Sequence, residues 1–143
     1  MPTSMLKGTY FQSMDAKGRM SFPTKLREVV GEKFIITRGI DGCLFVYSLE
    51  DFEAMAEKIS SLPMGKGKGI QRHFMAWASE VEADKQGRIL VPQSLRELAN
   101  LTKEVVVAGV SSRAEIWDKQ AWDKANEEYD DDKFVEELEE LDF

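Results

Sequence analysis

Two short segments of the sequence place a carboxylate and a guanidinium four residues apart around a glycine. Residues 15–19 read DAKGR, and residues 84–88 read DKQGR. The aspartate of such a segment can accept hydrogen bonds from the N–H groups of its own turn, and the arginine can pair with it to hold a hairpin closed. A free guanidinium can instead bind phosphates or the edges of bases. A single turn leaves both interpretations open, but a second copy favours a functional one.

Lysines and arginines cluster around both turns, which a turn that serves folding alone does not require. Two basic hairpins related by a twofold axis suit the twofold backbone of duplex DNA, because a two-stranded ribbon fits the major groove. Flanking cations can bind phosphates while the turn arginines approach the bases. We expect Asp15, Gly18, Asp84 and Gly87 to shape the turns, since glycine readily takes a positive φ. The candidates for DNA contact are Lys17, Arg19, Lys25, Arg27, Lys85, Arg88 and Arg96.

The two turns belong to a longer repeat. DAKGRMSFPTKLRE (15–28) aligns without a gap with DKQGRILVPQSLRE (84–97), and FIITRG (34–39) later falls against EVVVAG (104–109). One such unit is too small to bury its apolar face alone. Two units can interlock and remove the open sheet edges. The sequence therefore predicts a mainly β fold with short helices, of the α+β class, in which two tandem units form one pseudo-dimeric β-barrel.

Each copy predicts the same order of elements. Strands are expected at 7–13, 19–22, 33–38 and 43–47, and again at 78–83, 88–91, 104–110 and 114–117. Pro23 and Pro92 would each sit just inside a helix start, and Ser48 and Asp118 would cap the helix that closes each unit. The glycines and Pro63 in 61–69 predict a flexible basic linker, followed by a helical stretch at 70–78. The predicted divisions are domain 1 (7–53), helix and Gly/Lys-rich linker (54–76), domain 2 (77–123) and acidic tail (124–143).

Charge is distributed unevenly over the 143 residues. The net charge is −7, yet residues 115–143 hold 13 acids and 3 bases, so the preceding residues carry 16 bases and 13 acids. Because attraction to phosphate depends on local potential, the acidic total does not exclude nucleic acid. Apolar residues at the end of the tail predict a helix there, frayed or docked on a neighbouring subunit.

Other kinds of chemistry find little support in the sequence. Cys43 and His73 are the single cysteine and the single histidine, too few for a disulfide or a structural zinc site, which favours a reducing cytoplasm. No apolar run reaches the length of about 20 residues that crosses a bilayer. No nucleophile, base and orienting acid come together in a motif. We therefore expect no enzyme, no metal, no cofactor, no small-molecule substrate and no membrane partner.

The pattern D-x-K-G-R followed by P-x-x-L-R-E resembles the SpoVT-AbrB hairpin. Two tandem copies with the closing GVSSRAEIW resemble the MraZ family. This resemblance implies a bacterial transcription regulator, a repressor that binds direct repeats in its own promoter upstream of division and cell-wall genes. It also implies swapped-hairpin barrels, closed rings, association with the nucleoid and no cofactor. The family motif falls on Asp15/Arg19 and Asp84/Arg88, with Arg19 the foremost candidate for DNA contact.

One departure from the family pattern and two alternative functions remain. The first copy has Lys17 where the second has Gln86, with Lys85 beside it, so the second turn is expected to contact DNA less strongly or to serve in subunit packing. An AbrB-like antitoxin would neutralise a toxin through its tail, and an oligomeric scaffold would not bind nucleic acid at all.

Four aromatic residues could pack within the body or between protomers: Phe74, Trp77, Trp117 and Trp122.

Overall fold

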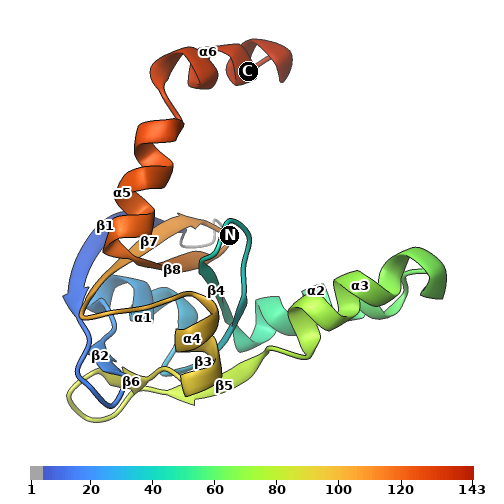
Figure 1. Ribbon diagram of the computed structural model, residues 1–143. Helices are drawn as coiled ribbons and strands as arrows, with labels where there is room; N and C mark the ends of the chain where they lie inside the picture. Colours follow the sequence, from blue (N-terminus) through green and yellow to red (C-terminus); the bar gives the residue numbers. More distant parts are fainter. Residues whose placement is uncertain (1–4) are drawn as a thin grey trace.

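A computed structural model describes residues 5–143. The first copy contains β1 (Leu6–Ser13), β2 (Arg19–Ser21), α1 (Thr24–Val30), β3 (Lys33–Arg38), β4 (Leu44–Ser48) and α2 (Leu49–Ser60). The second contains β5 (Ser79–Glu82), β6 (Arg88–Leu90), α4 (Gln93–Leu98), β7 (Glu104–Ser111), β8 (Ala114–Asp118) and α5 (Lys119–Glu128). α3 (Met64–Met75) lies between the copies, and α6 (Asp131–Glu140) follows the second (Figure 1).

The two copies exchange strands. The six-stranded sheet has the order β1-β7-β8-β4-β3-β5, and all of its neighbours run antiparallel. The first strand of each copy therefore pairs with the third strand of the other, while β4 and β8 meet in the centre. Exchanging the two copies leaves this order unchanged, which is the pseudo-twofold arrangement that the repeat predicts. The α+β class and the interlocking of two units are confirmed.

A second, two-stranded sheet occupies the remaining side of the body. β2 and β6 pair antiparallel, and an isolated bridge between Met14 and Met20 ties the end of β1 to β2. β2 also lies against β1, and β6 against β5. This ribbon therefore stands between β1 and β5, the two strands at which the order of the larger sheet ends. It covers the core on the side that the larger sheet leaves open.

The core joins both halves. The largest cluster combines side chains of both copies, among them Phe22 and Phe34 from the first and Leu95 and Ile116 from the second, all at most 1% exposed. A smaller cluster on the other face of the larger sheet is built on Cys43, Phe45, Val106 and Trp117. The four aromatic residues left open by the sequence pack on these clusters: Trp77 on the first, and Phe74, Trp117 and Trp122 in the second. Their packing within the chain is thereby shown.

Most of the local signals hold. The Ser48 hydroxyl accepts from the Asp51 N–H at 3.0 Å, and an Asp118 carboxylate oxygen accepts from the Gln120 N–H at 3.2 Å, so both closing helices are capped as expected. Pro23 and Pro92 occupy the N-cap position rather than the first helical residue.

The prediction of a flexible linker over residues 61–69 is wrong from Met64 onward. Residues 64–75 form one helix, α3, which begins at Met64, contains the whole GKGKG segment (65–69) and packs against α2. The helical stretch predicted at 70–78 is confirmed as far as Met75. Glycines are poor helix formers, which is why the sequence favours a loop. Gly67 has a packing reason: a Cβ there would lie 2.5 Å from Leu62 Cβ. A glycine thus allows the short turn between the two helices.

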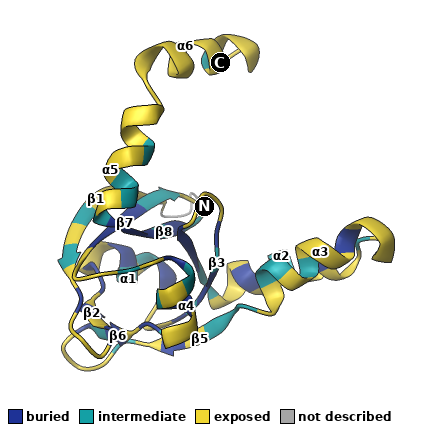
Figure 2. Cartoon of the chain, in the orientation of Figure 1, coloured by how far each residue is buried: buried dark blue, intermediate teal, exposed yellow. Residues whose placement is uncertain are grey.

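Two helical arms leave the body in different directions. α2 and α3 form one arm, and α5 carries α6 away from the sheet (Figure 1). Most residues of α6 are exposed (Figure 2). Within residues 5–143, no helix is long and apolar enough to cross a membrane.

Candidate nucleic-acid interface

The first turn is built around the Asp15 carboxylate. Its Oδ1 accepts from the backbone N–H groups of Lys17 and Arg19, both at 2.9 Å, and its Oδ2 accepts from Arg19 Nε at 2.9 Å. The Gly18 N–H donates to the Asp15 carbonyl at 3.0 Å, and Gly18 has a φ of 90°. One carboxylate thus organises both the backbone of the turn and the side chain that leaves it.

The second turn repeats this geometry. Asp84 Oδ1 accepts from the N–H groups of Gln86 and Arg88 at 2.9 Å, and Oδ2 accepts from Arg88 Nε at 3.1 Å. Gly87 has a φ of 78°. The turn-shaping residues of both copies therefore lie where the sequence places them. The shared positions Asp, Gly and Arg account for the shared conformation.

Hydrogen bonding shifts the acidity of both carboxyls in the same direction. The backbone N–H of Arg19 lowers the pKa of Asp15 below its ordinary 3.8, helped by the Arg19 side chain and the Lys17 N–H. The backbone N–H of Arg88 likewise lowers the pKa of Asp84. Both aspartates are therefore ionised at neutral pH and remain available to orient the arginines.

Strand register brings the two turn arginines to one surface. In the β2–β6 ribbon Arg19 pairs with Leu90, and Ser21 pairs with Arg88. Side chains alternate between the faces of a strand, so Arg19 and Arg88 share the outer face of the ribbon. They are diagonal neighbours across its two strands, and residues so placed are typically about 7–8 Å apart. The intervening pair, Met20 and Ile89, faces the core and is 1% exposed at each residue.

Both guanidiniums remain accessible despite their ion pairs. The Arg19 side chain is 43% exposed and that of Arg88 is 40% exposed. Each uses Nε for its aspartate, and across residues 5–143 neither terminal amino group has a protein acceptor. The folding interpretation and the binding interpretation of the turn are therefore compatible. The aspartate fixes the side chain by one edge and leaves the outer edge free to donate.

Arg27 and Arg96 support the turns from the opposite copy. Arg96 of α4 covers Gly18, where an added Cβ would lie 2.4 Å from Arg96 Nε. Arg27 of α1 covers Gly87, where an added Cβ would lie 2.6 Å from an Arg27 terminal nitrogen. Each Nε donates to a carbonyl, Arg27 to Phe22 at 3.1 Å and Arg96 to Val91 at 2.9 Å. The structure thus gives both a packing role under the turns.

The two supporting arginines differ in how firmly they are held. The Arg27 terminal nitrogens also donate to Thr24 at 3.2 Å and to Glu32 at 3.3 Å. Within the described chain, the Arg96 side chain makes only its hydrogen bond to the Val91 carbonyl. The second turn is therefore packed against a fixed arginine, and the first against a less restrained one.

The remaining candidates are exposed lysines. Lys17 and Lys85 lie within the two turns, and Lys25 lies on α1. Sequence reasoning missed Ser21 and Leu90, which share the outer face of the ribbon with the two arginines; Leu90 is 54% exposed. The polar–apolar–polar alternation of RMS could have identified Ser21, whereas RIL gives no such signal because Leu90 is apolar like Ile89. No cluster of metal-ligating side chains occurs in residues 5–143.

A family model described as "MraZ protein, putative antitoxin-like" matches residues 5–68 and 74–142. The chain belongs to the MraZ family. The two matched segments correspond to the two interlocked copies, apart from the middle of α3. Membership thus accounts for nearly all of the described chain.

Curated relatives support this assignment at high identity. A protein of Acetivibrio thermocellus is 53% identical over 121 residues, which cover 83% of this chain and 85% of the relative. A protein of Caldanaerobacter subterraneus is 48% identical over 128 residues, covering 88% and 90%. A protein of Caldicellulosiruptor saccharolyticus is 48% identical over 141 residues, covering 96% and 99%. Each is named "Transcriptional regulator MraZ". This naming confirms the expected class, a regulator of transcription and not an enzyme.

Proposed function

We propose that this MraZ-family chain is a sequence-specific DNA-binding repressor that acts in the cytoplasm on the nucleoid. It binds direct repeats in its own promoter, upstream of division and cell-wall genes. The outer face of the β2–β6 ribbon enters the major groove, with Arg19 and Arg88 directed at base edges. Lys17, Lys85 and Lys25 bind phosphates on either side.

One observation carries this proposal. Two guanidiniums, each held through Nε by its own aspartate, stand on the outer face of a single ribbon, and no acceptor among residues 5–143 engages their terminal amino groups. Arginine recognises guanine through two parallel hydrogen bonds, and a preset side chain loses less entropy when it makes them. The pseudo-twofold ribbon matches the local symmetry of duplex DNA.

The surroundings of the ribbon fit this role. The ribbon lies at the end of the body away from α5 and α6 (Figure 1). Residues 115–143, which include both helices, hold 13 acids and 3 bases. Charge repulsion between DNA phosphates and the acidic tail is thereby limited, since surface charges are screened beyond about 10 Å at ordinary salt.

Arg27 and Arg96 act in this proposal chiefly as positioning residues. Their Nε atoms are engaged by carbonyls and their planes cover the turn glycines. The terminal nitrogens of Arg96 remain the better placed of the two pairs to add a phosphate contact.

The regulator works as a closed homo-oligomeric ring. A single ribbon offers few phosphate contacts and binds weakly, whereas several joined subunits on several repeats gain avidity without new contacts. Direct repeats in the DNA all have the same orientation, which suits the subunits of a ring because each is related to the next by the same rotation.

A gel-shift titration tests the proposal. Purified protein is titrated against a duplex from its own upstream region and against a scrambled duplex of equal length, at several salt concentrations. We expect preference for the upstream duplex, and log K falling with log salt by about 0.9 for each phosphate neutralised. Equal binding to both duplexes would exclude sequence specificity. Absence of binding at low salt would favour a scaffold.

A further inference from the structure

The last helix, α6, contributes no side chain to either core cluster of residues 5–143. It spans 10 residues, Asp131–Glu140, and none of them is buried. Its links to the rest of the chain are local: Lys133 Nζ donates to the Glu128 carbonyl at 2.8 Å, and the Tyr129 hydroxyl donates to the Glu137 carboxylate. An isolated helix of this length is marginal in water. Its stability therefore calls for a partner surface.

α6 offers that partner a defined face. Phe134, Leu138 and Leu141 recur at the spacing of one side of a helix, and Phe134 and Leu141 are 48% and 78% exposed. Asp131 and Glu137 flank this face, and the rest of the helix surface is acidic as well, with six carboxylates and one lysine in residues 131–140. A matching surface needs apolar side chains flanked by cations.

α3 is such a surface. Met64, Lys68, Arg72 and Met75 recur at helical spacing along one exposed side of it, and it has no acidic residue. Met64 and Met75 are 74% and 39% exposed. With 12 residues it is as long as α6 requires. The helices thus complement each other in length, in charge and in their apolar side chains.

α3 is also a rigid platform. The Thr37 hydroxyl of β3 donates to the Phe74 carbonyl at 2.6 Å, and Gln71 Nε2 donates to the Ile59 carbonyl of α2 at 3.1 Å. The His73 ring hydrogen-bonds the Gly39 carbonyl at 2.8 Å. The end of α3 nearest the body is thereby fixed in place. Its exposed side does not need to order itself before binding.

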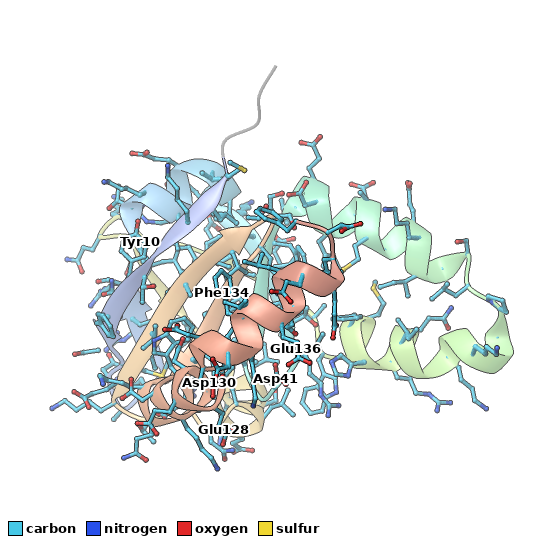
Figure 3. All side chains as sticks on the ribbon, turned by 90° about the horizontal axis from the view of Figure 1, so that it is seen from above. Tyr10, Asp41, Glu128, Asp130, Phe134 and Glu136 are labelled. Carbon is cyan, nitrogen blue, oxygen red and sulfur yellow. The ribbon has the colours of Figure 1, made fainter. Side chains whose placement is uncertain are left out.

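The two helices of one chain do not meet. α6 stands well clear of the α2–α3 arm in Figure 1, and no contact of α6 with α3 occurs at the level of packed elements. Seen from above, α2 and α3 extend to one side of the body, while Phe134 and Glu136 belong to the helix that crosses above it (Figure 3). A second chain must bring the partner helix.

We propose that α6 of one copy of this chain packs on α3 of a second copy. Phe134, Leu138 and Leu141 would cover Met64 and Met75, while Asp131 and Glu137 at the edges of the α6 face pair with Lys68 and Arg72. The contact joins two different surfaces, so it is head-to-tail and leaves one α6 and one α3 for further copies. The β2–β6 ribbon takes no part and remains free. The proposal rests on the homo-oligomer of the proposed function and names its contact.

Charge reversal tests this contact. Variant one carries Lys68→Glu and Arg72→Glu; variant two carries Asp131→Lys and Glu137→Lys. Both are expected to fall from the wild-type mass to monomers or small species in sedimentation velocity, because like charges then face each other. The matched control, Lys7→Glu with Lys33→Glu, reverses two exposed lysines of β1 and β3 and is expected to retain the wild-type mass.

Mixing the two variants gives the decisive result. The unaltered α6 of variant one meets the unaltered α3 of variant two, and the two reversed helices also attract each other. An equimolar mixture is therefore expected to recover the wild-type mass, which neither variant reaches alone. Retained mass in either variant, or no recovery on mixing, would overturn the docking. A monomeric wild type would overturn it as well.

DNA binding is measured separately so that the two proposals can fail independently. On a short duplex with one binding repeat, variant one should match wild type within about twofold, because the ribbon is unaltered. A marked loss there at unchanged mass would make α3 a DNA surface and overturn the docking. Failure of all variants and wild type to bind the duplex, with the mixing result intact, would overturn the DNA proposal alone.

Discussion

The two turns have nearly the same internal geometry and different surroundings. In both, one aspartate accepts two backbone N–H groups at 2.9 Å and the Nε of its arginine. Lys17 of the first turn has no equivalent in the second, where Gln86 takes its place. Beneath the second turn Arg27 is held by Thr24 and Glu32, whereas Arg96 beneath the first is not similarly held. Duplication thus preserved the scaffold while the contacts that can differ in function diverged.

The largest effect is expected when a turn arginine is removed. Arg19→Ala should weaken binding to the upstream duplex by about tenfold to a hundredfold, since one bidentate base contact is worth about 1–3 kcal/mol. Arg88→Ala should weaken binding less, because its turn has Gln86 at the position of Lys17 and its own lysine, Lys85, is displaced by one residue.

Gel-shift titration of both variants checks this order, and sedimentation shows whether their mass is unchanged. Equal losses in the two variants would mean that the two turns contribute alike. Wild-type affinity in Arg19→Ala would contradict the role of the ribbon in binding.

Removing Arg27 or Arg96, the two arginines that cover the turn glycines, should lower the free energy of unfolding by different amounts. Arg27→Ala leaves the buried Phe22 carbonyl without its side-chain donor, and such a loss costs about 1–3 kcal/mol. Arg96→Ala should cost less in the free energy of unfolding, because Arg96 makes fewer bonds, but should weaken DNA binding more through a loosened first turn.

Denaturant unfolding and gel shift on the same samples measure the two effects. Lys replacements at both positions serve as controls that keep the charge but not the planar group that covers the glycine. If the charge-conserving Arg96→Lys binds DNA like wild type, Arg96 acts by its charge and not by its packing.

The sequence predicts well the features that recur in both copies, and it predicts poorly the contacts between the copies. Turn residues, strands and the caps at Ser48 and Asp118 follow from local chemistry, and that chemistry recurs in both copies. The position of Arg96 over Gly18 depends on strand exchange between copies, which no local pattern specifies. The first half of α3 was predicted as a linker because the packing of Gly67 against Leu62 exists only once α2 and α3 fold against each other.

Exchanging the third residues of the D-x-x-G-R motif, Lys17 and Gln86, should have a smaller effect, on the salt dependence of DNA binding. Lys17→Gln should reduce the steepness of log K against log salt by about 0.9, the value for one phosphate contact in duplex DNA. Gln86→Lys should raise it by a similar amount if both turns approach the backbone equally. Titrations at four or more salt concentrations give the slopes. Unchanged slopes in both variants would remove these positions from the phosphate contacts.

The smallest expected effect is on the pKa values of the two turn aspartates, Asp15 and Asp84. Both pKa values are lowered, first of all by the backbone N–H of the following arginine. A carboxyl whose pKa is lower in the folded state stabilises the fold above its unfolded pKa, and this contribution is lost as pH falls through the folded value. For both turns this places the loss below about pH 4.

Carboxyl NMR titration of wild type and of Arg19→Ala separates the causes. Because the backbone donor survives the substitution, Asp15 should still titrate below 3.8 in the variant, although nearer to it than in wild type. Asp84 should be unaffected and serves as the internal control. A return of Asp15 to its ordinary value would show that the guanidinium, rather than the backbone of the turn, sets its acidity. The first turn would then depend on an arginine that DNA binding must share.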